Sequence, residues 1–237
     1  MSSTEPEPSI VYPESDGKPM ADNMLQFSYI VYIKEGLSSI FHQSDDVLVA
    51  GDLLWYPVEK QPAICAAPDA MVVFGRPRRM DLGSYKQFEE DDIAPQVVFE
   101  VISPNNTARE MEQKLDFYDE HGVEEYYVYD PQKGTLEGYQ RDGEHLRAIL
   151  EMNGWVSPRL GVRFELRADE LILYESSGEM FRSLPEHNEL RKLAEQRAEE
   201  ERQRAEEERQ RADKAEQELT RLRERLHALG VEIEDAE

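Results

Sequence analysis

Two carboxylates in apolar surroundings are the first residues of this sequence that suggest chemistry. Glu100 interrupts the apolar run QVVFEVI at residues 96–102, and Asp69 follows Pro68 at the start of a second apolar run, DAMVVF, at residues 69–74. An ionised carboxylate in a dry strand is costly unless it has a partner, a metal ion or a raised pKa. Both positions therefore indicate a functional site.

A lysine on the helix that follows Glu100 is the third member of the set. Residues 108–121 are expected to form a helix, and at 100° per residue Lys114 falls within its apolar stripe, which contains Met111, Leu115, Phe117 and Tyr118. An inward ammonium is one interpretation. The other is that Lys114 lies along the surface and pairs with Glu110 one turn earlier.

These three side chains suit a hard divalent cation and the water it activates. If the two apolar runs pair as neighbouring strands, Asp69 and Glu100 reach one end of the sheet. Mg²⁺ or Mn²⁺ then needs only two carboxylates and a backbone carbonyl, because Mg²⁺ keeps several waters. Such an ion polarises a phosphoryl oxygen and lowers the pKa of a bound water, while a lysine orients that water or stabilises developing charge.

Other chemistries find less support. The five histidines show no zinc-ligand spacing, and there is no GxSxG elbow, phosphate-binding glycine loop or dinucleotide fingerprint. A glycosidase could use Asp69 and Glu100, but it would leave Lys114 without a task.

The elements that must position these residues follow from periodicity and turn signals. A helix is expected over residues 22–41, ended early by Gly36 and the serine pair that follows, and the helix over 108–121 starts at the capping box TARE. Strands are expected at residues 47–57, 69–74, 96–102 and 125–130, followed by a hairpin with arms at 135–141 and 145–150.

The segments APDAMVV, VVFEVISPNN and YDEHGVEEYYVYDP, with Lys114 between the last two, resemble the Uma-two family of proposed restriction endonucleases, in the PD-(D/E)xK nuclease superfamily. The resemblance covers residues 22–175 and implies an α/β fold with a restriction-endonuclease-like mixed sheet flanked by helices. That superfamily shares a core of helix, three strands, helix and strand, which is the order expected above.

The resemblance also implies roles for single residues. Asp69 corresponds to the motif aspartate, Glu100 to the motif acid, and the carbonyl of Val101 to the group that often completes the metal site. The sequence departs from the pattern at Ile102, where the family motif has its lysine. Lys114 is the candidate for a lysine that has moved to the following helix.

Two nearby features have alternative interpretations. Asp52 could be a further carboxylate near the metal ion, although an ordinary turn aspartate after Gly51 is favoured. The cluster of Arg76, Arg78 and Arg79 could contact phosphates or simply balance an acidic surface.

Composition predicts three parts: a flexible acidic arm over residues 1–21, a nuclease-like domain over 22–184, and a charged heptad-repeat helix over 185–237. The core positions of that repeat alternate alanine with glutamate in its first half and are leucine in its second, so a single helix and a coiled coil are both open. One cysteine and the lack of a signal peptide or an apolar span predict a cytoplasmic protein with no membrane contact.

The sequence therefore predicts a Mg²⁺-dependent endonuclease that acts on DNA as a homodimer. The net charge of −24 counts against this, because nucleic acids attract basic surfaces. The alternative is a catalytically inert nuclease-like domain that acts in protein association through its acidic surface and C-terminal helix.

Overall fold

The computed structural model describes residues 10–15, 17, 20–79, 81–182, 202–204 and 209. The chain divides into two compact units, Met1–Leu184 and Pro185–Glu237. In the second unit the described residues are helical, and the remainder of the predicted heptad-repeat helix lies outside the described residues. No helix in the described ranges is long and apolar enough to span a bilayer.

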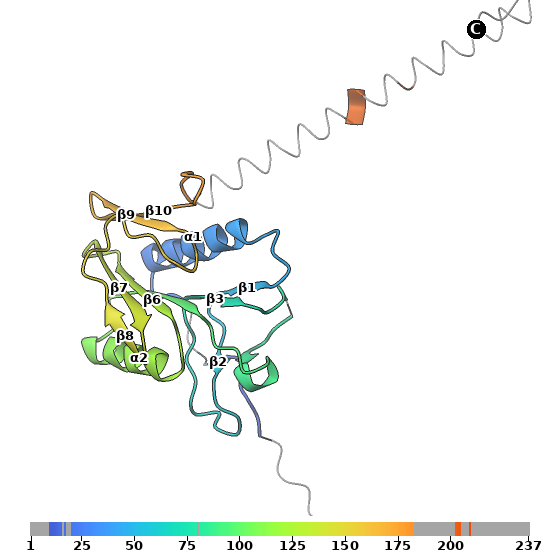
Figure 1. Ribbon diagram of the computed structural model, residues 1–237, viewed down its shortest axis with the longest axis vertical. Helices are drawn as coiled ribbons and strands as arrows, with labels where there is room; N and C mark the ends of the chain where they lie inside the picture. Colours follow the sequence, from blue (N-terminus) through green and yellow to red (C-terminus); the bar gives the residue numbers. More distant parts are fainter. Residues whose placement is uncertain are drawn as a thin grey trace, which may run out of the picture. The chain divides into compact units, whose positions relative to one another are not determined.

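A six-stranded mixed sheet forms the centre of the first unit (Figure 1). Its strand order is β1-β3-β5-β6-β7-β8, and every neighbouring pair is antiparallel except β5 and β6. The bounds are Val47–Ala50 for β1, Ala70–Phe74 for β3, Val97–Val101 for β5, Glu125–Asp130 for β6, Thr135–Asp142 for β7 and His145–Ala148 for β8.

Two small sheets accompany the central one. The parallel pair β2 (Trp55–Tyr56) and β4 (Tyr85–Lys86) precedes a short 3-10 helix, η1 (Gln87–Glu89). The antiparallel hairpin of β9 (Arg163–Arg167) and β10 (Glu170–Tyr174) follows β8. The strand expected over residues 47–57 is thus divided between two sheets, as β1 and β2.

Two apolar layers sandwich the central sheet. On one face, α1 (Met24–Ile40) and the β9–β10 hairpin pack against side chains such as Val97, Phe99 and Val101. On the other face, α2 (Ala108–Glu120) and the β2–β4 pair pack against side chains such as Val98 and Tyr126 (Figure 1). The predicted order of helix, three strands, helix and strand is present, with β2 and β4 added as short inserts.

Helix α1 does not end at Gly36, as the sequence analysis expected, but continues to Ile40. A Cβ built on Gly36 would lie 1.9 Å from Cδ2 of Phe181, which packs directly on the helix backbone. The glycine is therefore needed for close approach rather than for termination, and tertiary packing outweighs its low helix propensity.

Helix α2 begins as predicted. The Thr107 side chain accepts a hydrogen bond from the backbone N–H of Glu110 at 3.2 Å, which caps the first turn. After the C-cap residue His121, Gly122 takes a positive φ of 87°, as expected for a glycine that follows a helix.

Part of the segment predicted as a flexible arm contacts the domain. The ring of Tyr12 packs 5.1 Å from that of Tyr56 and 5.3 Å from that of Phe88, measured between centroids. The hydroxyl of Tyr56 donates to the carbonyl of Pro13 at 2.8 Å. Residues 1–9 lie outside the described ranges.

Candidate active site

Strand pairing places Asp69 beside Glu100. Strands β3 and β5 are antiparallel with Ala70 opposite Phe99, so the residue before Ala70 lies next to the residue after Phe99. The register is held further by a hydrogen bond of 2.6 Å from the backbone N–H of Val101 to Oδ2 of Asp69. The neighbouring strands that the sequence analysis expected are confirmed.

Alternation along β5 then points Glu100 at helix α2. Phe99 and Val101 lie in the core layer of α1, so Glu100 between them faces the opposite layer. There Lys114 Nζ lies 2.7 Å from Glu100 Oε2, and the Tyr118 hydroxyl donates to Glu100 Oε1 at 2.5 Å. Glu100 is only 3% exposed, so the two donors provide the partners that a buried carboxylate needs.

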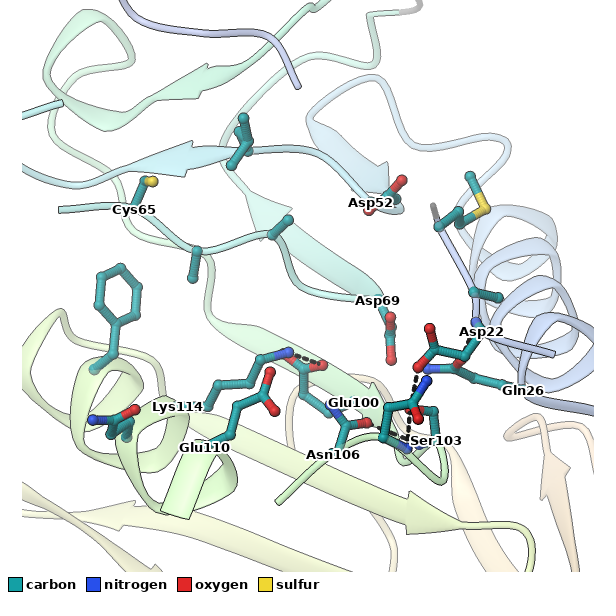
Figure 2. A pocket seen from close by; sticks show the side chains of 18 residues that line it. Asp22, Gln26, Asp52, Cys65, Asp69, Glu100, Ser103, Asn106, Glu110 and Lys114 are labelled. Atoms are coloured by element: carbon teal, nitrogen blue, oxygen red, sulfur yellow. Dashed lines mark hydrogen bonds and ion pairs between the residues drawn. The ribbon is translucent and has the colours of Figure 1, made fainter. Parts of the chain in front are cut away.

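Asp69, Glu100 and Lys114 line one cavity of about 670 Å³ (Figure 2). Among the described residues that line it, the carboxylates outnumber the ammonium of Lys114 by five to one. The carboxylates are those of Asp22, Asp52, Asp69, Glu100 and Glu110. The structure does not form the pair of Lys114 and Glu110 that was the alternative interpretation, because the ammonium reaches Glu100 instead. The inward orientation of Lys114 is therefore confirmed.

The charge imbalance alters the protonation of the site. Burial raises the pKa of Asp69 well above its ordinary value, and the charges of Glu100 and Asp52 add to the shift against the opposing effects of Lys114 and the Val101 N–H. Burial by itself would lower the pKa of Lys114, but the charge and hydrogen bond of Glu100 outweigh it and raise that pKa. Lys114 is therefore an ammonium at neutral pH.

The Val101 carbonyl, which the family resemblance implies as a metal ligand, already accepts one hydrogen bond. Gln26 Nε2 on α1 donates to it at 2.8 Å, and Gln26 Oε1 accepts from the Asp22 backbone N–H at 2.8 Å. A carbonyl oxygen has two lone pairs, so one position remains for a cation.

The donor set fits a divalent cation that keeps most of its water. No three His, Cys, Asp or Glu side chains in the described ranges are arranged to hold a metal ion. The groups that could hold Mg²⁺ or Mn²⁺ are the carboxylates of Asp69 and Glu100 and the carbonyl of Val101, with water in the remaining positions.

The remaining predicted residues are placed as follows. Asp52 lines the cavity and takes the left-handed φ of 50° typical of a turn, which agrees with the favoured interpretation as a turn aspartate. Arg76 pairs with Glu90 and Asp91, and Arg79 pairs with Glu90 at 2.7 Å, which favours the interpretation that this cluster balances acidic groups. Ile102, at the family's lysine position, is packed against the α2-side core.

Sequence reasoning did not assign a site role to Tyr118, Gln26 or Asp22. Tyr118 had a signal, because it lies four residues after Lys114 in the same helical stripe. For Gln26, a buried amide that contacts a strand 75 residues away, the sequence offered no comparable signal.

Comparisons with known proteins identify the family of the chain. Residues 33–170, which include Asp69, Glu100 and Lys114, match a family model named Uma2 and described as "Putative restriction endonuclease". A crystal structure of a putative nuclease from Anabaena variabilis is similar with a TM-score of 0.43 and 15% identity, over 60% of this chain and 74% of that one. A search of curated proteins found no match.

Proposed function

The chain belongs to the Uma2 family of putative restriction endonucleases, and from this premise we propose that it is a divalent-metal-dependent endonuclease that hydrolyses phosphodiester bonds in DNA. Asp69, Glu100 and Lys114 are the residues to which we assign the chemistry. The observation that carries the proposal is their arrangement around one cavity, with two carboxylates on adjacent strands and an ammonium 2.7 Å from one of them.

Each residue has a role that its surroundings allow. Asp69 and Glu100 would hold Mg²⁺ or Mn²⁺ with the Val101 carbonyl, and the bound ion would supply a Lewis acid and a water of lowered pKa. Lys114, as an ammonium with a raised pKa, has no lone pair to act as a base. It can donate hydrogen bonds to the attacking water or to a phosphoryl oxygen, so its contribution is positioning and charge stabilisation.

The position of Lys114 on α2 supports the idea of a relocated lysine. Strand β5 carries Ile102 where the family motif has lysine, yet the ammonium of Lys114 reaches the acid of that same motif from the helix that covers it. The positive charge is thus present at the site although the strand position is apolar.

The negative charge of the cavity affects how the DNA backbone could approach it. Lys114 is the only cationic side chain among the described residues that line it, so side chains alone leave the cavity repulsive to phosphate. We therefore expect a divalent cation to be needed for the approach of the backbone as well as for hydrolysis.

Cleavage of supercoiled plasmid DNA tests the proposal. The full chain with Mg²⁺ or Mn²⁺ is expected to nick or linearise the plasmid, and EDTA is expected to stop it. Asp69→Asn, Glu100→Gln and Lys114→Met are each expected to lower the rate by about 100-fold or more, because each removes charge that acts on the transition state.

Lys133→Met is the matched control, since it removes an exposed lysine that pairs only with Asp130 among the salt bridges of the described residues. It should cleave like the unaltered protein. A chain that neither cleaves DNA nor gains thermal stability from either cation would instead support the inert nuclease-like domain that acts in protein association.

A further inference from the structure

We propose that Tyr118 is a positioning residue that holds the Glu100 carboxylate in the orientation needed to bind a divalent cation. The inference rests on the proposed function, because it concerns the metal affinity of the same site. The observation behind it is the hydrogen bond of 2.5 Å from the Tyr118 hydroxyl to Glu100 Oε1, in surroundings where Tyr118 is fully buried.

The two oxygens of Glu100 have separate donors. Lys114 Nζ contacts Oε2 and the Tyr118 hydroxyl contacts Oε1, so rotation of the carboxylate about its last bond would break both contacts. Both donors come from α2, one turn apart, and thus move together. An ionised carboxylate offers about four lone-pair positions, so two donors still leave positions for a cation.

Tyr118 itself is held firmly by its neighbours. Its ring is nearly parallel to that of Trp55, at 4° and 6.3 Å between centroids, and lies 4.9 Å from the ring of Tyr126. Because the ring cannot turn without displacing these side chains, the direction of its hydroxyl is set by core packing. The hydrogen bond from this fixed hydroxyl therefore restricts the orientation of the Glu100 carboxylate.

Tyr118 acts through Glu100 and not on a substrate. It does not line the cavity, whereas Lys114 does and keeps 26% of its side chain exposed. A tyrosine hydroxyl is an ordinary hydrogen-bond donor, and here it donates to Glu100 Oε1. Partners of this kind orient metal ligands, and their loss typically weakens metal binding by about 10–100-fold.

Tyr126 provides a matched control on the adjacent strand. It is 1% exposed, its ring packs against Tyr118, and its buried hydroxyl has no hydrogen-bond partner within the described part of the chain. Tyr126→Phe therefore removes a hydroxyl of the same burial from the same cluster without removing a contact to Glu100.

The test is the affinity of the full chain for Mn²⁺ alone, measured from the electron paramagnetic resonance signal of the free ion. Tyr118→Phe is expected to weaken Mn²⁺ binding by about 10–100-fold, and Tyr126→Phe by less than about twofold. Excess Mn²⁺ should restore plasmid cleavage by Tyr118→Phe, because only the occupancy of the site is impaired. Unfolding in EDTA checks that both variants are folded.

Equal Mn²⁺ affinities for Tyr118→Phe and the unaltered chain would overturn the inference, and so would equal weakening in both variants. If Tyr118→Phe does not fold, Tyr118→4-aminophenylalanine retains the ring with a weaker donor. Intermediate affinity then supports the role, and unchanged affinity overturns it. An unaltered chain that binds no Mn²⁺ would overturn the proposed function as well. Mn²⁺ binding that is the same with and without the Tyr118 hydroxyl would overturn only this inference.

Discussion

Asp69 and Glu100 lie side by side, but their hydrogen-bond partners differ. The two oxygens of Glu100 each accept a hydrogen bond, one from the Lys114 ammonium and one from the Tyr118 hydroxyl. Asp69 has the backbone N–H of Val101 and lies near the negative charges of Glu100 and Asp52. The free-energy cost of keeping two carboxylates in the cavity therefore falls mainly on Asp69.

Because the ionised carboxylate of Asp69 destabilises the fold, a substitution that removes its charge should stabilise the protein, by an amount that depends on pH. A folded pKa raised above the unfolded value of 3.8 means that ionisation of Asp69 destabilises the fold as pH rises above that value. In EDTA at pH 8, Asp69→Asn should raise the free energy of unfolding by about 1.4 kcal/mol for each unit by which the pKa was raised. The Asn oxygen still accepts from Val101, and urea unfolding measures the gain.

The gain should shrink as pH falls toward 3.8, where Asp69 takes up a proton in both states. Asp130 offers the opposite case. Burial alone would raise its pKa, but hydrogen bonds from Lys133 and from backbone N–H groups lower it, so Asp130→Asn should destabilise the protein at pH 8. A loss of stability in Asp69→Asn at pH 8 would contradict the account of the site.

Helices α1 and α2 are both joined to the sheet by polar contacts at particular residues. Gln26 joins α1 to the end of β5, and Asp119 joins α2 to β8 by accepting from the Leu146 backbone N–H at 2.6 Å. Arg141 on β7 adds a hydrogen bond of 2.7 Å to the Asp119 carbonyl. These contacts add polar attachments to the apolar packing that holds the two helices on the sheet.

The contact between Gly36 and Phe181 predicts an unusual effect of alanine in a helix. Alanine ordinarily stabilises a helix interior by about 1 kcal/mol relative to glycine. In Gly36→Ala the new methyl group would overlap the Phe181 ring, so we expect a net loss of about 1–3 kcal/mol in the free energy of unfolding.

Ser39→Ala, at an exposed position of the same helix, is the control for Gly36→Ala and should leave stability nearly unchanged. Chemical denaturation of the two variants decides the matter. Equal or greater stability of Gly36→Ala would show that Phe181 does not pack on the helix backbone.

Asp119→Ala should weaken the attachment of α2 to the β7–β8 hairpin. Burial alone would raise the pKa of Asp119, but hydrogen bonds from His145 and Leu146 and the charge of Arg141 lower it below 3.8. The ionised group therefore stabilises the fold above pH 3.8, and this contribution is lost as pH falls through the lowered pKa. We expect a loss of about 1–2 kcal/mol at pH 7 that becomes smaller below pH 3.8.

Asp119→Asn keeps an oxygen for the Leu146 N–H and should lose less than Asp119→Ala. Urea unfolding at pH 7 and pH 3 separates the two variants. If the effect of Asp119→Ala is the same at both pH values, the charge of Asp119 contributes nothing to this contact.

At the scale of the whole molecule, an acidic nuclease-like domain is followed by a charged repeat. Residues 1–184 carry 34 acidic against 16 basic residues, so both the domain and its candidate cavity are negative. The repeat has leucine at heptad spacing only in its second half, which limits the length of an apolar seam. We infer that self-association, if it pairs two sites on a duplex, depends mainly on the domain.

Sedimentation of the full chain and of a chain that ends at Leu184 tests this. We expect the full chain to be a homodimer, and the shorter chain to remain dimeric at micromolar concentration with a weaker association constant. A shorter chain that is wholly monomeric would assign the dimer to residues 185–237. A monomeric full chain would contradict the homodimer that the sequence analysis predicts.

The sequence alone determined the features that depend on local periodicity. The order of the main elements and the capped start of α2 at Thr107 follow from patterns within about ten residues, and the structure agrees with them. The same periodicity placed Lys114 in the apolar stripe of α2, but the structure decided between its two interpretations. The family resemblance, which assigned roles to Asp69 and Glu100, rested mainly on the long stretch from EVISPNN to GVEEYYVYDP, and the match to the family model supports that resemblance.

The tertiary structure alone decided which distant groups meet. Three contacts join residues that are distant in the sequence: Gln26 with Val101, Phe181 with Gly36, and the hydroxyl of Tyr118 with Glu100. The division of residues 47–57 between two sheets likewise depends on pairing with distant strands. Periodicity gives the face on which a side chain lies, but not the partner that it meets there, because that partner depends on how strands and helices pack together.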